Sequence, residues 1–152
     1  MKRHYPWILS LFFFLNVSAG KSQPEIDHWE TIVKASDTWK YFPGTSEPPS
    51  NWYELSFNDS AWSAGIGGFG YGDGDDGMVI DTVLSVYLRK VFTVYDTSVI
   101  TSVLLHVDYD DAFVAWLNGI EIARANIGIT GDHPAYNELA SSGHEAVLYQ
   151  GQ

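Results

Sequence analysis

The sequence predicts an all-β protein, folded as an antiparallel β-sandwich. Short segments rich in β-branched and aromatic residues follow one another, with turn residues between them. Beyond the first twenty residues, no stretch of ten residues shows the 3.6-residue periodicity of an amphipathic helix. Aromatic residues make up 15% of the chain, and they favour the pleated, half-buried positions of sheets.

Residues 1–20 form a predicted secretory signal peptide. Lys2 and Arg3 precede a nine-residue apolar run (7–15), and the small residues 17–19 then offer a peptidase site. The apolar run is too short to cross a bilayer. With cleavage near Ala19-Gly20, we expect a protein that is secreted, on the cell surface or in a bacterial periplasm, and a mature chain without a membrane span.

Residues 25–152 form the predicted sandwich domain, which begins with short elements. Residues 28–34 and 38–42 mix β-branched and aromatic side chains and are expected to be strands. A loop rich in Pro, Gly and Ser (43–51) follows, because its two adjacent prolines cannot lie inside an element. Residues 52–62 are ambiguous and compatible with a helical turn.

The second half of the chain carries the clearest strand patterns. Apolar residues alternate over 86–96 and 102–110, which predicts two strands. Two apolar runs flank Asn118-Gly119 within residues 112–124, and this pair favours a two-residue type I′ hairpin turn. The expected core includes Trp62, which anchors a turn, and the strand residues Leu88, Phe92, Val103, Leu105, Val107, Phe113, Ala115 and Leu117.

The end of the sequence predicts an incomplete sandwich. Residues 145–150 read as another strand, and no segment follows that could pair back and close the sheet. An unpaired sheet edge invites aggregation. We therefore expect a domain that lacks its closing C-terminal strand or strands and that forms the first part of a longer gene product.

Composition excludes several functions. At 152 residues and 45% hydrophobic, the chain is one domain with a real core. The net charge of −11 leaves no cluster of cations to bind nucleic acid or an anionic membrane surface. The absence of cysteine excludes zinc fingers, thiol catalysis and disulfides.

The glycine-rich stretch GIGGFGYGDGDDG (65–77) contains G-x-G-x-x-G, the spacing of a dinucleotide-binding loop. That motif has meaning only between a buried strand and a helix, and glycine at this density cannot start a helix. The EF-hand spacing fails as well. A solvated acidic turn is the favoured reading, while a looser site for a structural calcium ion stays open, with the candidate ligands Asp73, Asp75, Asp76 and Asp81.

A second acidic cluster surrounds residues 108–111. Asp108 and Asp111 could serve as the paired carboxylates of a glycoside hydrolase. Aspartates between two strands more often make side-chain turns, so the sequence predicts a turn here and no enzyme.

Four motifs together resemble a galactose-binding-like jelly-roll domain. They are the turn FNDSAW (57–62), the loop GGFGYGDG (67–74), the strand VYLRKVFTV (86–94) and the hairpin HVDYDDAFVAWLNGIEIAR (106–124). Their order is similar to that in the first domain of large secreted bacterial proteins, ahead of a spore-coat-kinase-like or lamin-tail-like region. It is also similar to the sugar-binding domain of some glycoside hydrolases. The resemblance covers residues 28–150, but the G-x-N-x-L-A closing strand usual in such domains is absent.

The resemblance implies a non-catalytic binding module attached to downstream domains of the same polypeptide, with carbohydrate as a common ligand and a structural calcium ion as a frequent one. Sugar sites place an aromatic platform beside hydrogen-bonding groups. The alternatives are a structural or protein-interaction spacer without a small ligand and, third, a glycoside hydrolase fragment. The expected ligand-binding residues on loops are Trp52, Tyr53, Tyr71, Asp73, Asp75 and Tyr136.

Overall fold

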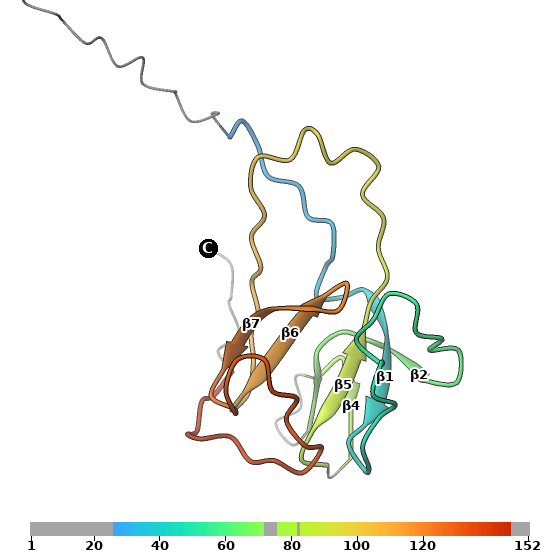
Figure 1. Cartoon of the computed structure of the whole chain (residues 1–152), viewed down its shortest axis with the longest axis vertical. Helices are drawn as coiled ribbons and strands as arrows, with labels where there is room; N and C mark the ends of the chain where they lie inside the picture. Colours follow the sequence, from blue (N-terminus) through green and yellow to red (C-terminus); the bar gives the residue numbers. More distant parts are fainter. Residues whose placement is uncertain (1–25, 72–75, 82, 147–152) are drawn as a thin grey trace, which may run out of the picture.

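The protein is all-β in the computed structural model, which describes residues 26–71, 76–81 and 83–146. Within these ranges there is no helix, and so none that could cross a membrane. Seven short strands form three small sheets (Figure 1). The strands are β1 (Thr38–Pro43), β2 (Ser63–Ile66), β3 (Phe69–Gly70), β4 (Met78–Val79), β5 (Val86–Arg89), β6 (Phe113–Leu117) and β7 (Ile120–Ala125).

The largest sheet has the order β2-β1-β5, and both pairings are antiparallel. Its central strand β1 confirms the strand predicted over residues 38–42. Lys40 lies opposite Ala64 on one side and Arg89 on the other, so these three residues form one row across the sheet. Directly opposed residues of an antiparallel pair project from the same face.

The glycine-rich stretch lets backbone segments approach each other closely, because its glycines carry no side chain. Gly65 belongs to β2, and β3 pairs with β4 in parallel, two strands that the sequence did not predict. A Cβ on Gly67 would lie 1.7 Å from the carbonyl oxygen of Ala35, closer than any side chain allows. Glycine is therefore required here for backbone contact, and the described residues that follow it, 68–71 and 76–81, form no helix of the kind that a dinucleotide-binding loop precedes.

The hairpin predicted over residues 112–124 is confirmed as β6 and β7. Leu117 pairs with Ile120 across the turn, and Asn118 and Gly119 have φ of 51° and 85°. Both central residues of a type I′ turn need positive φ, which explains the Asn-Gly pair. The register shifts between Ala115 and Trp116, whose partners are Ala123 and Glu121, so the extra residue Ile122 marks a bulge in β7.

An aromatic cluster joins the large sheet to the hairpin. Trp62, predicted to anchor a turn, is 8% exposed and lies against the rings of Phe42 and Phe57. The ring of Trp52 contacts Trp62, with centroids 6.1 Å apart, and Trp116 of the hairpin, with centroids 5.2 Å apart. Aromatic contacts thus hold the body of the molecule together.

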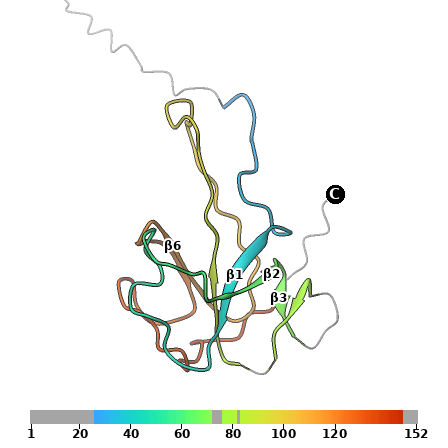
Figure 2. The same cartoon turned by 90° about the vertical axis from the view of Figure 1, so that its right-hand side faces the viewer.

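The segment between β5 and β6 is an extended arm (residues 90–110), which leaves the body and returns to it (yellow in Figures 1 and 2). The strands predicted over 86–96 and 102–110 are therefore wrong beyond Arg89. Alternation shows which residues could form a strand, but pairing needs a neighbouring strand, and the described chain supplies none along the arm. The expected core residues Phe92, Val103 and Leu105, which lie in the arm, are accordingly 39–76% exposed, and Leu117, beside the hairpin turn, is 40% exposed. The other four, Leu88, Val107, Phe113 and Ala115, are half-buried.

Two further strand predictions concern the ends of the domain. Residues 28–34 form no strand, because no neighbouring segment pairs with them. Of the strand predicted over 145–150, residues 147–150 lie outside the described ranges, and 145 and 146 belong to no strand. The signal peptide predicted over residues 1–20 also lies outside them.

Candidate functional site

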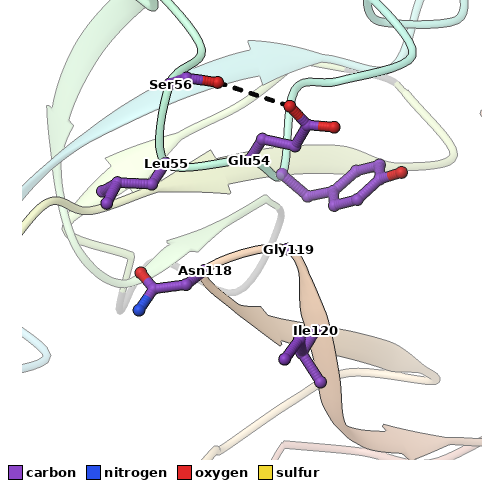
Figure 3. Close-up of a pocket in the computed structure, with 7 residues that line it drawn as sticks. Glu54, Leu55, Ser56, Asn118, Gly119 and Ile120 are labelled. Carbon is purple, nitrogen blue, oxygen red and sulfur yellow. Dashed lines mark hydrogen bonds between the residues drawn. The ribbon is translucent and has the colours of Figure 1, made fainter.

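An open groove of about 630 Å³ separates residues 53–56 from the tip of the β6–β7 hairpin (Figure 3). Tyr53, Glu54, Leu55 and Ser56 form one wall, and Asn118, Gly119 and Ile120 form the other. The lining mixes aromatic, aliphatic, carboxylate, hydroxyl and amide groups. Small-molecule sites have this volume and this combination of apolar surface with a few polar groups.

Arg89, on β5, fixes the first wall from behind. Its guanidinium donates hydrogen bonds to the carbonyl oxygens of Trp52 and Glu54, the latter at 3.0 Å. Its Nε donates to Asp59 Oδ2 at 3.0 Å, and its cationic carbon lies 5.1 Å from the centre of the Phe57 ring. A bidentate planar cation suits such a role, because it satisfies several acceptors in a fixed geometry.

The Arg89 side chain is 8% exposed, and Asp59 is also partly buried. A buried charge is tolerated only when it is paired and hydrogen-bonded, as this one is. The contact joins two of the motifs that carry the family resemblance, the FNDSAW turn and the VYLRK strand. Spacing along the sequence gave no indication that these two segments meet.

The second wall is the hairpin turn itself. A Cβ on Gly119 would lie 3.9 Å from Glu54 Cγ, so the turn approaches the first wall closely. The Glu54 carboxylate accepts a 3.4 Å hydrogen bond from Ser56 Oγ, and Figure 3 shows this contact on the side of the wall that lies away from the turn. Asn118 adds an exposed amide, which can donate and accept hydrogen bonds.

Stacked rings lie at the end of the groove where Tyr53 lines it. The imidazole of His133 lies 4.6 Å from the Tyr53 ring and 5.6 Å from the Trp116 ring, and it is nearly parallel to Trp116. His133 itself is exposed. Tyr53 and Trp116 are half-buried, so part of the stack reaches the surface, where the apolar face of a sugar can pack on an aromatic ring.

A second arginine, Arg124 on β7, holds the loop that carries His133. It forms a bidentate pair with Glu121, with both N–O distances 2.9 Å, and donates to the carbonyl oxygens of Ile127 and Asp132. Glu121 also accepts a 2.9 Å hydrogen bond from the Gly131 N–H. The hydrogen bonds from Arg124 and Gly131 lower the pKa of Glu121 to about 2, so the pair is ionised at neutral pH.

The predicted ligand-binding residues fall in different places. Tyr53 lines the groove, while Trp52 lies behind it in the aromatic cluster. Tyr71, in the glycine-rich stretch, is 66% exposed. The backbone N–H of Tyr136 donates a 3.0 Å hydrogen bond to the Glu47 carboxylate. Neither tyrosine lines the groove. Asp73 and Asp75 lie outside the described residues.

The predicted calcium ligands are described only in part. Asp76 is half-buried, and its buried Oδ2 has no hydrogen-bond partner among the described residues, whereas Asp81 is exposed. In the described ranges, no three His, Asp or Glu residues come together as a metal site would require. Calcium therefore stays a prediction that depends on residues 73 and 75.

The second acidic cluster is a turn. Asp111 has a φ of 56°, its Oδ1 accepts a 3.1 Å hydrogen bond from the His144 N–H, and its own N–H donates to the His144 carbonyl. The imidazole of His144 stacks on Tyr109, with ring centres 4.0 Å apart. These contacts fasten residues 140–146 to the base of the arm.

The polar half of the groove was not predicted from the sequence. Glu54 and Ser56 lie in a segment without periodicity, and Asn118 was recognised only as a turn residue. Comparisons of this chain with family models, with curated proteins and with solved structures find no match. The function proposed below therefore rests on the groove and on the motifs in the sequence.

Proposed function

We propose that this chain is a secreted, non-catalytic module that binds carbohydrate in the groove between residues 53–56 and 118–120. It would be a sandwich of the galactose-binding-like jelly-roll type and the N-terminal part of a larger multidomain protein. The all-β architecture and the arginine that ties two family motifs together support this assignment.

The composition of the groove is the observation that carries the proposal. Sugars need hydrogen-bonding groups around the ring edge and an aromatic surface for the ring face. Glu54, Ser56 and Asn118 supply the first, and Tyr53 supplies the second. Both walls are held by contacts outside the groove, so ligand groups do not have to order them.

A glycan array on the complete chain, followed by titration calorimetry with each hit, tests the proposal. Asn118→Gly removes the amide and keeps the positive φ of the turn. We expect it and Glu54→Gln to weaken binding by about tenfold each, as for the loss of one hydrogen bond to a desolvated polar group.

The matched control is Glu30→Gln, which removes an exposed carboxylate outside the groove lining and should leave affinity unchanged. Absence of binding to neutral and acidic glycans, or equal loss in the control, would refute carbohydrate binding in the groove. Hydrolysis of aryl glycosides by the wild-type chain would instead indicate a glycoside hydrolase fragment.

The arm favours a second candidate function, a protein-interaction or spacer module. Tyr95 is 98% exposed, Val103 76% and Leu104 74%, and large apolar side chains exposed together mark contact surfaces. Downstream domains of the same polypeptide are the natural partner for such a module. Under this function, replacing Val103 and Leu104 by Ser would abolish association with a downstream domain and leave glycan binding unchanged.

A further inference from the structure

Strands β1 and β5 run side by side in the large sheet (Figure 1). A second cleft, of about 240 Å³, lies along these two strands. Five Lys and Arg residues fall within the described ranges, and three of them, Lys40, Arg89 and Lys90, line this cleft. This concentration of cations contrasts with the net charge of −11. The rest of the lining is Thr38, Trp39, Asp59, Ala64 and Val91.

The sheet register brings two of the cations face to face. Lys40 and Arg89 are direct partners across β1 and β5, so their side chains project from the same face. Like charges opposed in this way are destabilising. A departure from the usual pairing rules is expected at functional sites, where a ligand offsets its cost.

Lys40 has no compensating carboxylate among the described residues. Its Nζ donates to the Trp62 carbonyl at 3.0 Å and forms no ion pair there. Lys90, in contrast, lies 3.4 Å from Asp37 Oδ2 and donates to the Thr38 carbonyl. A half-buried ammonium with one neutral acceptor retains donors for an anion.

Arg89 also has a donor left over. Its Nε and Nη1 are occupied, and Nη2 has no acceptor among the described residues. The Arg89 side chain is 8% exposed and lines the cleft. Asp59 lines the same cleft and would repel an anion, but its Oδ2 is bound to Arg89.

We propose that the cleft formed by Lys40, Arg89 and Lys90 binds the monoanionic group of an acidic ligand, a carboxylate or a sulfate ester. The three cations and their carboxylate partners Asp37 and Asp59 leave a net charge of 3 − 2 = +1, which one monoanion neutralises. The volume suits a single anionic group, with the rest of the ligand outside. The cleft shares no lining residue with the groove, although Arg89 also holds the first wall of the groove, and the site does not depend on the proposed function.

Titration calorimetry of the full chain at constant ionic strength tests the site. The probes are sodium glucuronate, glucose as its neutral counterpart, and sodium sulfate as a free inorganic anion. Glucuronate should bind and glucose should not. Sulfate binding to the same cleft without glucuronate binding would assign the site to a free oxyanion, whereas glucuronate alone would assign it to an acidic sugar.

The variants locate the binding. Lys40→Gln keeps an amide donor for the Trp62 carbonyl and should weaken glucuronate or sulfate binding by about tenfold or more, as for loss of a charged hydrogen bond. Lys40→Arg should retain it. Lys34→Gln is the matched control, because Lys34 is exposed and does not line the cleft.

NMR titration of the wild-type chain keeps the test independent of variant folding. Shift changes should centre on residues 38–40 and 89–91. No binding of either anion, equal binding of glucose, unchanged affinity in Lys40→Gln, or shift changes confined to the groove would each overturn the proposal.

Discussion

The body and the arm of this molecule use similar residues in opposite ways. In the body, buried and half-buried aromatic rings meet, and Arg89 and Arg124 satisfy carbonyl groups of neighbouring loops. In the arm, residues of the same apolar character extend into solvent, and Tyr95 is 98% exposed. Apolar content alone therefore does not decide burial. A segment is buried where another element covers it, and the described chain covers the body only.

Arg89→Met gives the largest expected effect. It leaves Asp59 and two carbonyl groups without their partner, and breaking a buried ion pair in this way costs about 3–5 kcal/mol of unfolding free energy. Urea denaturation followed by tryptophan fluorescence measures it. Lys34→Met, on an exposed side chain, should change stability by less than about 0.5 kcal/mol. Equal effects of the two substitutions would show that Arg89 does not hold the body together.

Gly119→Val should have the next largest effect. A β-branched residue at a φ of 85° is strained, and we expect a loss of about 1–3 kcal/mol in the unfolding free energy. Thermal melting by circular dichroism is the measurement. Gly119→Asn is the matched control, because Asn tolerates positive φ better than other residues. Unchanged stability of the valine variant would contradict the turn.

Acid should weaken the Glu121–Arg124 ion pair, with a smaller loss of unfolding free energy than these two substitutions cause. The pKa of Glu121 is lowered to about 2 from an ordinary value of 4.5. Because the folded pKa is the lower one, the contribution is fully present above about pH 4.5 and is lost as the pH falls toward 2. Stability curves from pH 6 to pH 2 should therefore be flatter for Glu121→Gln than for wild type. Parallel curves would show that this pair has no role in the acid sensitivity.

Substitutions in the arm should have the smallest effect on stability. Val103→Ser, at a side chain that is 76% exposed, should change the unfolding free energy by less than about 0.5 kcal/mol. Val114→Ser, on the half-buried strand β6, is the comparison and should cost about 1–2 kcal/mol. A large loss from Val103→Ser would mean that the arm packs against something in solution, and would remove the contrast with the body.

The sequence predicted the elements whose signals are local. The hairpin follows from Asn118-Gly119 between two apolar runs, and β1 follows from its β-branched and aromatic residues. It could not predict β3 and β4, because two-residue strands are set by backbone contacts of the glycine-rich stretch. It wrongly placed Val103 and Leu105 in the core, because alternation does not reveal whether a covering sheet exists.

The candidate groove was predicted in part, through Tyr53. Glu54 and Ser56 lie in an irregular turn, where polar residues carry no periodic signal. Their place at the groove depends on Arg89, which is 35 residues away in the chain from Glu54. Contacts over such separations come from the tertiary structure, and one sequence does not display them.

The contacts of Arg124 and Glu121 join residues close together in the sequence, so they should form early in folding. Glu121, Arg124 and their partners lie within a dozen residues of one another and adjoin a tight hairpin. Local contacts of this kind close within microseconds, whereas β1 must find β5 across a much longer loop. We therefore expect the hairpin and its loop to be formed in the folding transition state. Kinetic φ-values, the ratio of a mutation's effect on the folding barrier to its effect on stability, should be high at residues 114–124 and low in β1. Stopped-flow refolding of Arg124→Met should then be slowed, whereas Lys40→Gln should mainly change the rate of unfolding.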